Sequence, residues 1–258
     1  MNIVVLVKYV PDAASARSFN GDNTADRVGT DGRLSELDEY AIEKALKLVE
    51  AHGGEVTALT MGPAEAEAAL KKTLQMGAHA AVHVVDDALH GTDAPGTSLV
   101  LAAAIGKLEY DLVMCGMAST DGAMSVVPAM LAERLGLPQV TLASEVTVTD
   151  GSIRVRRDAE DATLEIEASL PAVVSVTDQT NEPRYPSFKG IMAAKKKPVT
   201  TWSLADLGVT PDQVGLGAAW TEVTEVTPRP LRTKGTIITD DGTAAAQVAA
   251  YLAAEKFV

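Results

Sequence analysis

The pattern of apolar and polar positions in the first half of the chain alternates between two periods. Four short runs have the composition of strands, and two of them, 3–7 and 112–115, are continuously apolar, which is typical of strands buried on both faces of a parallel sheet. Between them, apolar residues recur every three or four positions, the spacing of helices that cover a sheet. The expected strands are 3–7, 55–60, 80–85 and 112–115, and the expected helices are 35–52, 64–76, 97–107 and 123–135.

Strand and helix therefore alternate four times, which predicts right-handed βαβ units and an α/β fold with a mostly parallel sheet. From residue 141 the pattern becomes β-rich, in the runs 141–148, 152–157, 164–168 and 172–177. Asp150-Gly151 between the first two runs is a hairpin signal. We expect the end of the sheet to gain antiparallel strands.

The segment from Asn181 to Lys197 follows the last of these strands and mixes turn-forming with large apolar residues. Pro183, Pro186 and Gly190 predict a surface loop without regular structure. An aromatic at its centre and a lysine run behind it are typical of a docking element, although a loop that folds back over the core has the same composition. Its large apolar side chains are Tyr185, Phe188, Ile191 and Met192.

The stretch from residue 198 to 258 lacks the apolar periodicity of a second core. Pro198, Pro211, Pro228 and Pro230 divide it, and only 243–256 has the pattern of a helix. Such a stretch has to lie on another surface, either its own domain or a partner subunit. We expect three parts: an α/β nucleotide-binding domain over 1–182, a partner-recognition loop over 183–197 and an extended C-terminal arm over 198–258.

Charge and composition narrow the possible partners. The chain has 258 residues and a formal net charge of −13, so nucleic acid and anionic lipid repel it. The single cysteine, Cys115, permits no internal disulfide, and we expect a buried, inert thiol at the end of its strand. No apolar run approaches the roughly 20 residues of a membrane span, and the N-terminus has the pattern of a core strand. We expect a cytoplasmic protein without direct membrane insertion.

Candidate chemistry lies beyond the carboxyl ends of the strands, where ligands of open α/β sheets bind. The segments 7–12, 61–63 and 116–122 converge there. In the last of them, Gly116 permits close backbone approach, and the polar residues up to Asp121 precede a helix whose free N–H groups attract an anion. This pattern suits a phosphate, although an ordinary N-capped connection has it too.

The sequence lacks the common signatures of nucleotide chemistry. It has no Gly-x-Gly-x-x-Gly after a strand, no Gly-x-x-x-x-Gly-Lys-Ser/Thr and no Gly-x-Ser-x-Gly. The four histidines show no metal-ligand spacing, and the carboxylates lie on expected helix faces and turns. The pattern thus predicts nucleotide binding by a protein that is no enzyme and holds no metal.

An ordered set of motifs resembles the beta subunit of electron transfer flavoproteins over essentially the whole length. The most specific are Asn181-Glu182-Pro183-Arg184-Tyr185 and Ile191-Met192-x-Ala194-Lys195-Lys196-Lys197, and further ones are Val7-Lys8-x-Val10-Pro11-Asp12, Met76-Gly77-Ala78 and Leu135-Gly136-Leu137-Pro138-Gln139. The resemblance implies a Rossmann-like three-layer fold of the adenine-nucleotide α-hydrolase type.

The resemblance also implies a heterodimer with an alpha subunit, which carries most of the site for a redox-active FAD, while the beta subunit holds a structural AMP. Electrons would come from acyl-CoA dehydrogenases and similar flavoenzymes and pass to a quinone oxidoreductase. The arm over 198–258 would pack on the alpha subunit, and Tyr185, Phe188, Ile191 and Met192 would bind the dehydrogenase. The AMP would contact Leu6, Ser35, Asp38, Met61, Gly116, Ser119, Thr120, Asp121, Gly122, Ala123, Met124, Ser125, Val126 and Val127.

Departures from the family pattern leave more than one function open. Ser35-Glu36-Leu37-Asp38, a capping-box-like helix start, stands where many members have Asn-Pro-aromatic, and Met117-Ala118-Ser119-Thr120 where many have Lys-Gln-Ala-Ile. Ala13 stands where some members have a tyrosine that touches the flavin. Bifurcating members bind a second FAD in place of AMP. The same sequence could also belong to a stand-alone ATP- or AMP-binding α/β protein, or to a purely structural subunit with an empty pocket.

Overall fold

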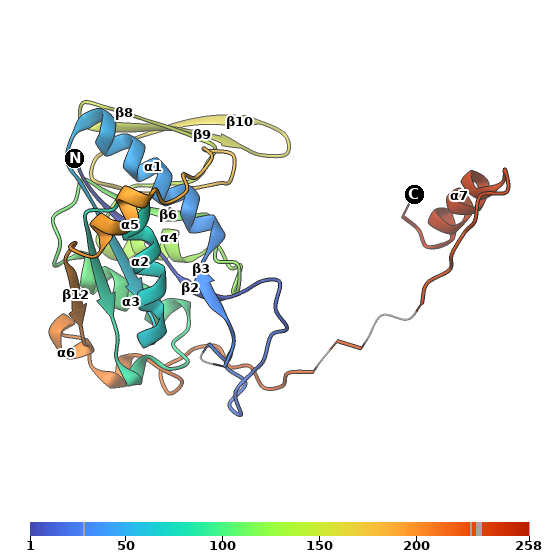
Figure 1. Cartoon of the computed structure of the whole chain (residues 1–258), viewed down its shortest axis with the longest axis horizontal. Coiled ribbons are helices and arrows are strands. Elements are labelled where there is room, and N and C mark those ends of the chain that lie inside the picture. The colour runs from blue at the N-terminus through green and yellow to red at the C-terminus, as the bar shows by residue number, and fades with distance from the viewer. Residues whose placement is uncertain (28, 228, 231–233, 258) are drawn as a thin grey trace. The chain divides into compact units, whose positions relative to one another are not determined.

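The structure is a computed structural model that describes residues 1–27, 29–227, 229–230 and 234–257. It consists of two compact units, Met1–Thr224 and Glu225–Val258. The first unit is a three-layer α/β domain whose central sheet lies between two layers of helices (Figure 1).

The central sheet has seven strands, and every neighbouring pair in it is parallel. Its order is β12-β5-β4-β1-β6-β11-β7, so the order reverses between β1 and β6. This reversal is the topological switch point at which ligands of such sheets bind. The strands are β1 (Asn2–Leu6), β4 (Glu55–Met61), β5 (Ala80–Val84), β6 (Leu112–Gly116), β7 (Gln139–Ala143), β11 (Ala172–Val176) and β12 (Val199–Trp202).

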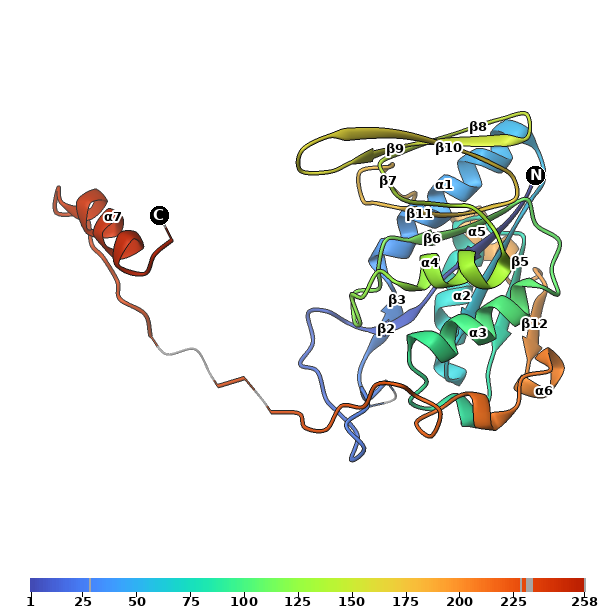
Figure 2. The same cartoon turned by 180° about the vertical axis from the view of Figure 1, so that it is seen from behind.

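The two faces of the sheet are covered by different helices, and alternate strand residues point to each. Ile3 and Val5 pack with α1 (Glu36–His52) and α2 (Glu67–Met76). Val4 and Leu6 pack with α3 (Ala94–Ile105) and α4 (Val127–Leu135), which Figure 2 shows from behind. Short 3₁₀ helices are η1 (Ala64–Ala66), η2 (Asp87–Leu89) and η3 (Pro211–Gln213). The predicted mostly parallel α/β fold is confirmed.

The antiparallel strands are present, but they do not extend the central sheet, so the position predicted for them is wrong. β8 (Glu145–Thr149), β9 (Ser152–Asp158) and β10 (Thr163–Ser169) form a sheet of their own. β11, which we expected in the antiparallel group, pairs in parallel with β6 and β7. Its five residues are all buried, which is the environment of a central parallel strand. A further small hairpin joins β2 (Tyr9–Pro11) and β3 (Gly32–Leu34).

Two helix starts differ from the prediction. α4 begins at Val127, four residues late, because Ala123 and Ser125 have φ of 52° and 58°, in the left-handed region that a right-handed helix excludes. Pro128 lies in its first turn, where it is tolerated. At α1, Ser35 occupies the N-cap position, but its side chain makes no capping hydrogen bond. The predicted capping box is therefore not formed.

The segment we expected to be irregular contains a short helix, α5 (Phe188–Ala194). The hydroxyl of Ser187 caps it by accepting from the Gly190 N–H (3.0 Å), so Pro186 lies outside the helix and only Gly190 disfavours it. The large apolar side chains of this segment do not fold back over the core. Tyr185 is 91% exposed and Phe188 81% exposed, and Ile191 and Met192 are also exposed.

The C-terminal arm does not begin at residue 198. β12 pairs with β5 at the edge of the central sheet, and α6 (Leu204–Leu207) follows it, so the chain through Thr224 belongs to the α/β unit. The Lys107 ammonium lies 5.6 Å from the centre of the Trp202 ring and donates to the Asp206 carbonyl.

The second unit contains α7 (Ala244–Ala254), at the position of the predicted helix. Pro228 lies outside the described residues. None of the described helices is both long and apolar enough to cross a membrane.

Candidate nucleotide site at the switch point

Lys8 connects the segments that meet at the carboxyl ends of β1 and β6. Its backbone N–H donates to the Asp38 carboxylate (2.8 Å), and its backbone carbonyl accepts from the Ser35 N–H (2.9 Å). Its ammonium donates to the Asp121 carboxylate (2.9 Å) and to the Ser119 hydroxyl (3.4 Å). Four residues that the sequence predicted at the site, from widely separated positions in the chain, thus lie around one lysine.

Gly116 ends β6 and brings the first turn of α1 against that strand. A Cβ at this position would lie 2.7 Å from the nearer Asp38 carboxylate oxygen and 2.8 Å from the Leu37 carbonyl oxygen. Both separations are shorter than real Cβ contacts, so a side chain would push the helix away. The glycine therefore permits close approach of α1, whereas the sequence predicted only the approach of a ligand.

The start of α1 buries two polar side chains with unequal hydrogen bonding. Burial raises the pKa of Asp38 to about 7, against the hydrogen bond and positive charge of Lys8, which lower it. The Ser35 side chain is fully buried, and its hydroxyl has no hydrogen-bond partner in the described part of the chain. A buried hydroxyl without a partner is unfavourable, so the start of α1 carries an unsatisfied polar group at this end of the sheet.

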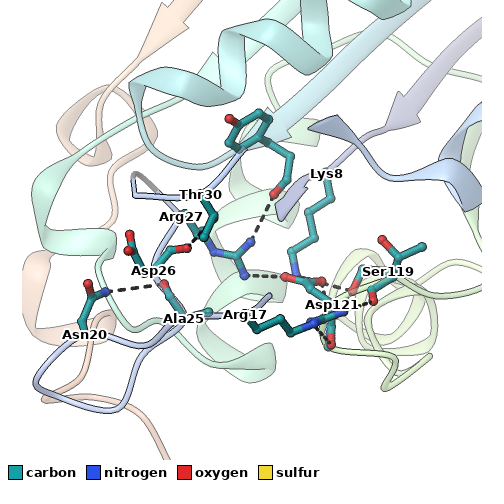
Figure 3. Close-up of polar contacts among 12 residues, drawn as sticks. Lys8, Arg17, Asn20, Ala25, Asp26, Arg27, Thr30, Ser119 and Asp121 are labelled. Carbon is teal, nitrogen blue, oxygen red and sulfur yellow. Dashed lines mark hydrogen bonds and ion pairs between the residues drawn. The ribbon is translucent and has the colours of Figure 1, made fainter. Parts of the chain in front are cut away.

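Asp121 is the centre of a cluster of cationic side chains, drawn in Figure 3. Besides Lys8, the Arg27 guanidinium contacts its carboxylate (2.5 Å), and Arg17 donates to the Thr120 carbonyl (3.0 Å) and more weakly to that of Asp121. Burial raises the pKa of Asp121, but the charges of Lys8 and Arg27 outweigh it and hold the pKa well below its usual range. Three cations thus gather on a strongly acidic chain, as an anion site requires.

The segment between Asp121 and α4 presents a run of backbone amides. The Gly122 N–H donates to the Asp121 carboxylate (2.7 Å), so Asp121 caps its own loop and not the helix. Among the described residues, the backbone N–H groups of Met124, Ser125, Val126 and Val127 have no acceptor. Consecutive free amides at the N-terminus of a helix favour phosphate and other anions.

A cavity of about 240 Å³ opens beside this cluster. Its volume is below the roughly 300 Å³ at which pockets for whole small ligands begin, so it suits part of a nucleotide. Leu6 and Met61 end the neighbouring strands β1 and β4, but neither of them lines this cavity, and Leu6 is buried in the core. The cavity is lined by Pro11, Arg17, Ser18, Phe19, Ala25, Asp26, Arg27, Asp121 and Gly122.

Sequence reasoning missed the cationic side chains of this site. Arg17 and Arg27 lie in a polar connection without periodicity, and they reach Asp121 only because the connection folds back over the 119–122 loop. Lys8 belongs to one of the family motifs, but the sequence assigned it no role. Cys115, one residue before Gly116, is buried as expected, and burial together with the Asp38 charge raises the pKa of its thiol.

Comparison with known proteins gives a consistent match. Residues 22–207 match the family described as electron transfer flavoprotein domain. The chain is 48% identical to the electron transfer flavoprotein subunit beta of Mycobacterium leprae, over 100% of this chain and 99% of that protein. It is 36% identical to the subunit of the same name from Clostridium acetobutylicum, over the full length of both. It is also 36% identical to the caffeyl-CoA reductase-Etf complex subunit CarD of Acetobacterium woodii, over 98% and 96%.

Proposed function

Because this chain belongs to the electron transfer flavoprotein family, as a beta subunit, we propose that it pairs with an alpha subunit and carries electrons without bond-breaking chemistry of its own. The alpha subunit supplies most of the site for a shared FAD, which is the group that accepts and releases the electrons. The donors are acyl-CoA dehydrogenases and related flavin dehydrogenases, and a quinone oxidoreductase is the acceptor. The second unit, Glu225–Val258, packs on the alpha subunit, and the heterodimer is cytoplasmic.

The site at the switch point holds a structural AMP in this proposal. The run of free amides at Met124–Val127, beside the cationic cluster on Asp121, is the observation that carries the assignment. Phosphate is held by these amides together with residues 119–123. The rest of the nucleotide would lie against Ser35 and Asp38 at the start of α1 and against the backbones at Leu6 and Met61, where β1 and β4 end.

A second FAD in this site is the alternative with an observation in its favour. The cavity continues from Asp121 to Arg17 and Arg27, so a cationic lining is present for a second phosphate. One relative is named as part of a complex with a reductase, and relatives of this chain therefore serve more than one kind of assembly. The match to beta subunits over the full length disfavours a stand-alone ATP-binding protein.

The nucleotides released from the denatured heterodimer distinguish these two proposals. Chromatography of the supernatant should give one AMP and one FAD for each dimer, because the beta site takes a monophosphate. The FAD of the alpha subunit provides an internal standard for recovery. Two FAD and no AMP would replace the AMP assignment by the bifurcating type, and FAD alone, in one copy, would indicate an empty beta site.

A further inference from the structure

Arg184 fastens the exposed segment before α5 to the long helix α1. Its guanidinium donates to both oxygens of Glu43 (2.7 and 3.1 Å) and to both oxygens of Glu50 (2.6 and 3.1 Å). Its backbone N–H also donates to Glu43 (3.1 Å). A planar guanidinium that pairs with two carboxylates at once fixes both the position and the direction of the chain that bears it.

The partners of Arg184 are themselves rigidly held. Glu43 and Glu50 are seven residues apart on α1, so two helical turns place them on one face. The Glu43 side chain is 4% exposed, and besides Arg184 the Lys47 ammonium, at 3.5 Å, is the only ion-pair partner of its carboxylate among the described residues. A buried carboxylate requires its cation, because the cost of leaving it without one is large. The segment is therefore held closely at Arg184.

Two further contacts hold the same segment on α2. Gly190 lies so close to the C-terminal end of α2 that a Cβ there would be 2.5 Å from the Gln75 carbonyl oxygen. Behind α5, the Lys197 ammonium donates to the carbonyls of Leu74 (3.0 Å) and Gly77 (3.1 Å) at the C-terminal end of α2. The segment is thus attached at both ends and in its middle, while its large apolar side chains stay exposed to solvent.

An exposed apolar side chain binds tightly only when little freedom is lost on binding. Tyr185 follows Arg184 directly, and Phe188 begins the helix three residues later. We propose that Arg184 is a positioning residue that holds Tyr185 and Phe188 in their docking arrangement before the electron donor arrives. This inference rests on the proposed function. The partner it fits is a flavoenzyme that offers an apolar pocket for an aromatic ring.

Arg184→Lys in the purified heterodimer tests this role. Lysine keeps the charge but cannot span two carboxylates, so the segment spends most of its time out of the docking arrangement. The KM for the donor dehydrogenase should rise about 10-fold, because the apparent affinity falls with the fraction of competent molecules. We expect an unchanged limiting rate of flavin reduction and unchanged contents of FAD and AMP. Amide hydrogen exchange in residues 184–192 should become faster. Glu50→Gln, at a half-exposed carboxylate, should give a smaller rise of about 3-fold.

A double-variant comparison separates positioning from general stability. In a Phe188→Ala, Tyr185→Ala background, Arg184→Lys should change the KM less than about 2-fold, because the two side chains that Arg184 positions are absent. Arg154→Lys is the matched control, since that arginine pairs with Glu167 (3.0 Å) on the separate antiparallel sheet. An unchanged KM for Arg184→Lys, or its full effect in the background without Tyr185 and Phe188, would overturn the positioning role. If Phe188→Ala itself leaves the KM unchanged, the docking function of this surface is wrong as well.

Discussion

Phe188→Ala is expected to weaken docking of the electron donor about 30-fold and to leave the cofactors in place. The Phe188 ring is 81% exposed on the first residue of α5, so its removal creates no cavity in the core. A single aromatic anchor in an interface contributes about 2 kcal/mol or more, which corresponds to that factor. In the proposed function this side chain contacts only the donor, so the loss falls on the complex and not on the fold.

The measurement is the rate of flavin reduction in the heterodimer as a function of the concentration of an acyl-CoA dehydrogenase. Leu164→Ala serves as the control, because Leu164 is also an exposed apolar residue (44%) but lies on β10 of the separate antiparallel sheet. The melting temperature and the FAD and AMP contents should match those of the parent. A variant that loses flavin or melts much earlier would show that Phe188 stabilises the subunit, and the anchor role would be wrong.

Asp38→Asn is expected to remove a pH dependence of stability between about pH 4 and pH 7. The folded-state pKa of Asp38 is raised to about 7 by burial, whereas its ordinary value is 3.8. In this window the folded chain keeps a proton that the unfolded chain has released, so the free energy of unfolding falls as the pH rises. Three units of pKa correspond to roughly 4 kcal/mol for a single group. The amide oxygen of the substituted side chain would still accept from the Lys8 N–H, and so the fold should be retained.

Urea unfolding at pH 5 and at pH 7.5 compares the two proteins, at equal protein and nucleotide concentrations. The free energy of unfolding of the parent should fall from pH 5 to pH 7.5, and that of Asp38→Asn should fall much less. The variant should therefore be more stable relative to the parent at pH 7.5 than at pH 5. The carboxylates with lowered pKa, Asp121 among them, contribute stability that is lost only below about pH 4 and do not interfere. Equal slopes in both proteins would mean that Asp38 is ionised in the folded chain throughout this range.

The sequence pattern predicted those elements whose own apolar residues identify them as a buried strand or as a helix with one buried face. Buried strands such as Ile3–Leu6 are continuously apolar, and α1 has a clear apolar stripe, so periodicity alone places them. Periodicity failed where contacts between distant parts of the chain determine the position of an element. The run at 172–176 has the pattern of one of several β-rich stretches, but its burial on both faces places it between β6 and β7. The late start of α4 depends on left-handed residues that are not glycine, Ala123 and Ser125, which no composition rule identifies.

The same distinction holds for the candidate nucleotide site. Asp121 and its neighbours follow a predicted strand, and the rule that ligands bind at the carboxyl ends located them. Arg17 and Arg27, which contact this loop, come from an irregular connection. In such a connection neither apolar periodicity nor motif spacing predicts where a side chain lies in the fold. The ion pairs of Arg184 were invisible for a similar reason. Arg184 belongs to a family motif, but Glu43 has the appearance of one more carboxylate on a helix until the fold buries it.

The most direct test of the proposed function is the visible absorbance spectrum of this chain, purified alone and after co-expression with a tagged alpha subunit. We predict that the chain alone is colourless, and that the tag recovers an equimolar complex with flavin absorbance. That absorbance should bleach when an acyl-CoA dehydrogenase and its substrate are added. A well-folded chain that is yellow without a partner, or that fails to join the alpha subunit, would contradict the assignment as the beta subunit of an electron carrier.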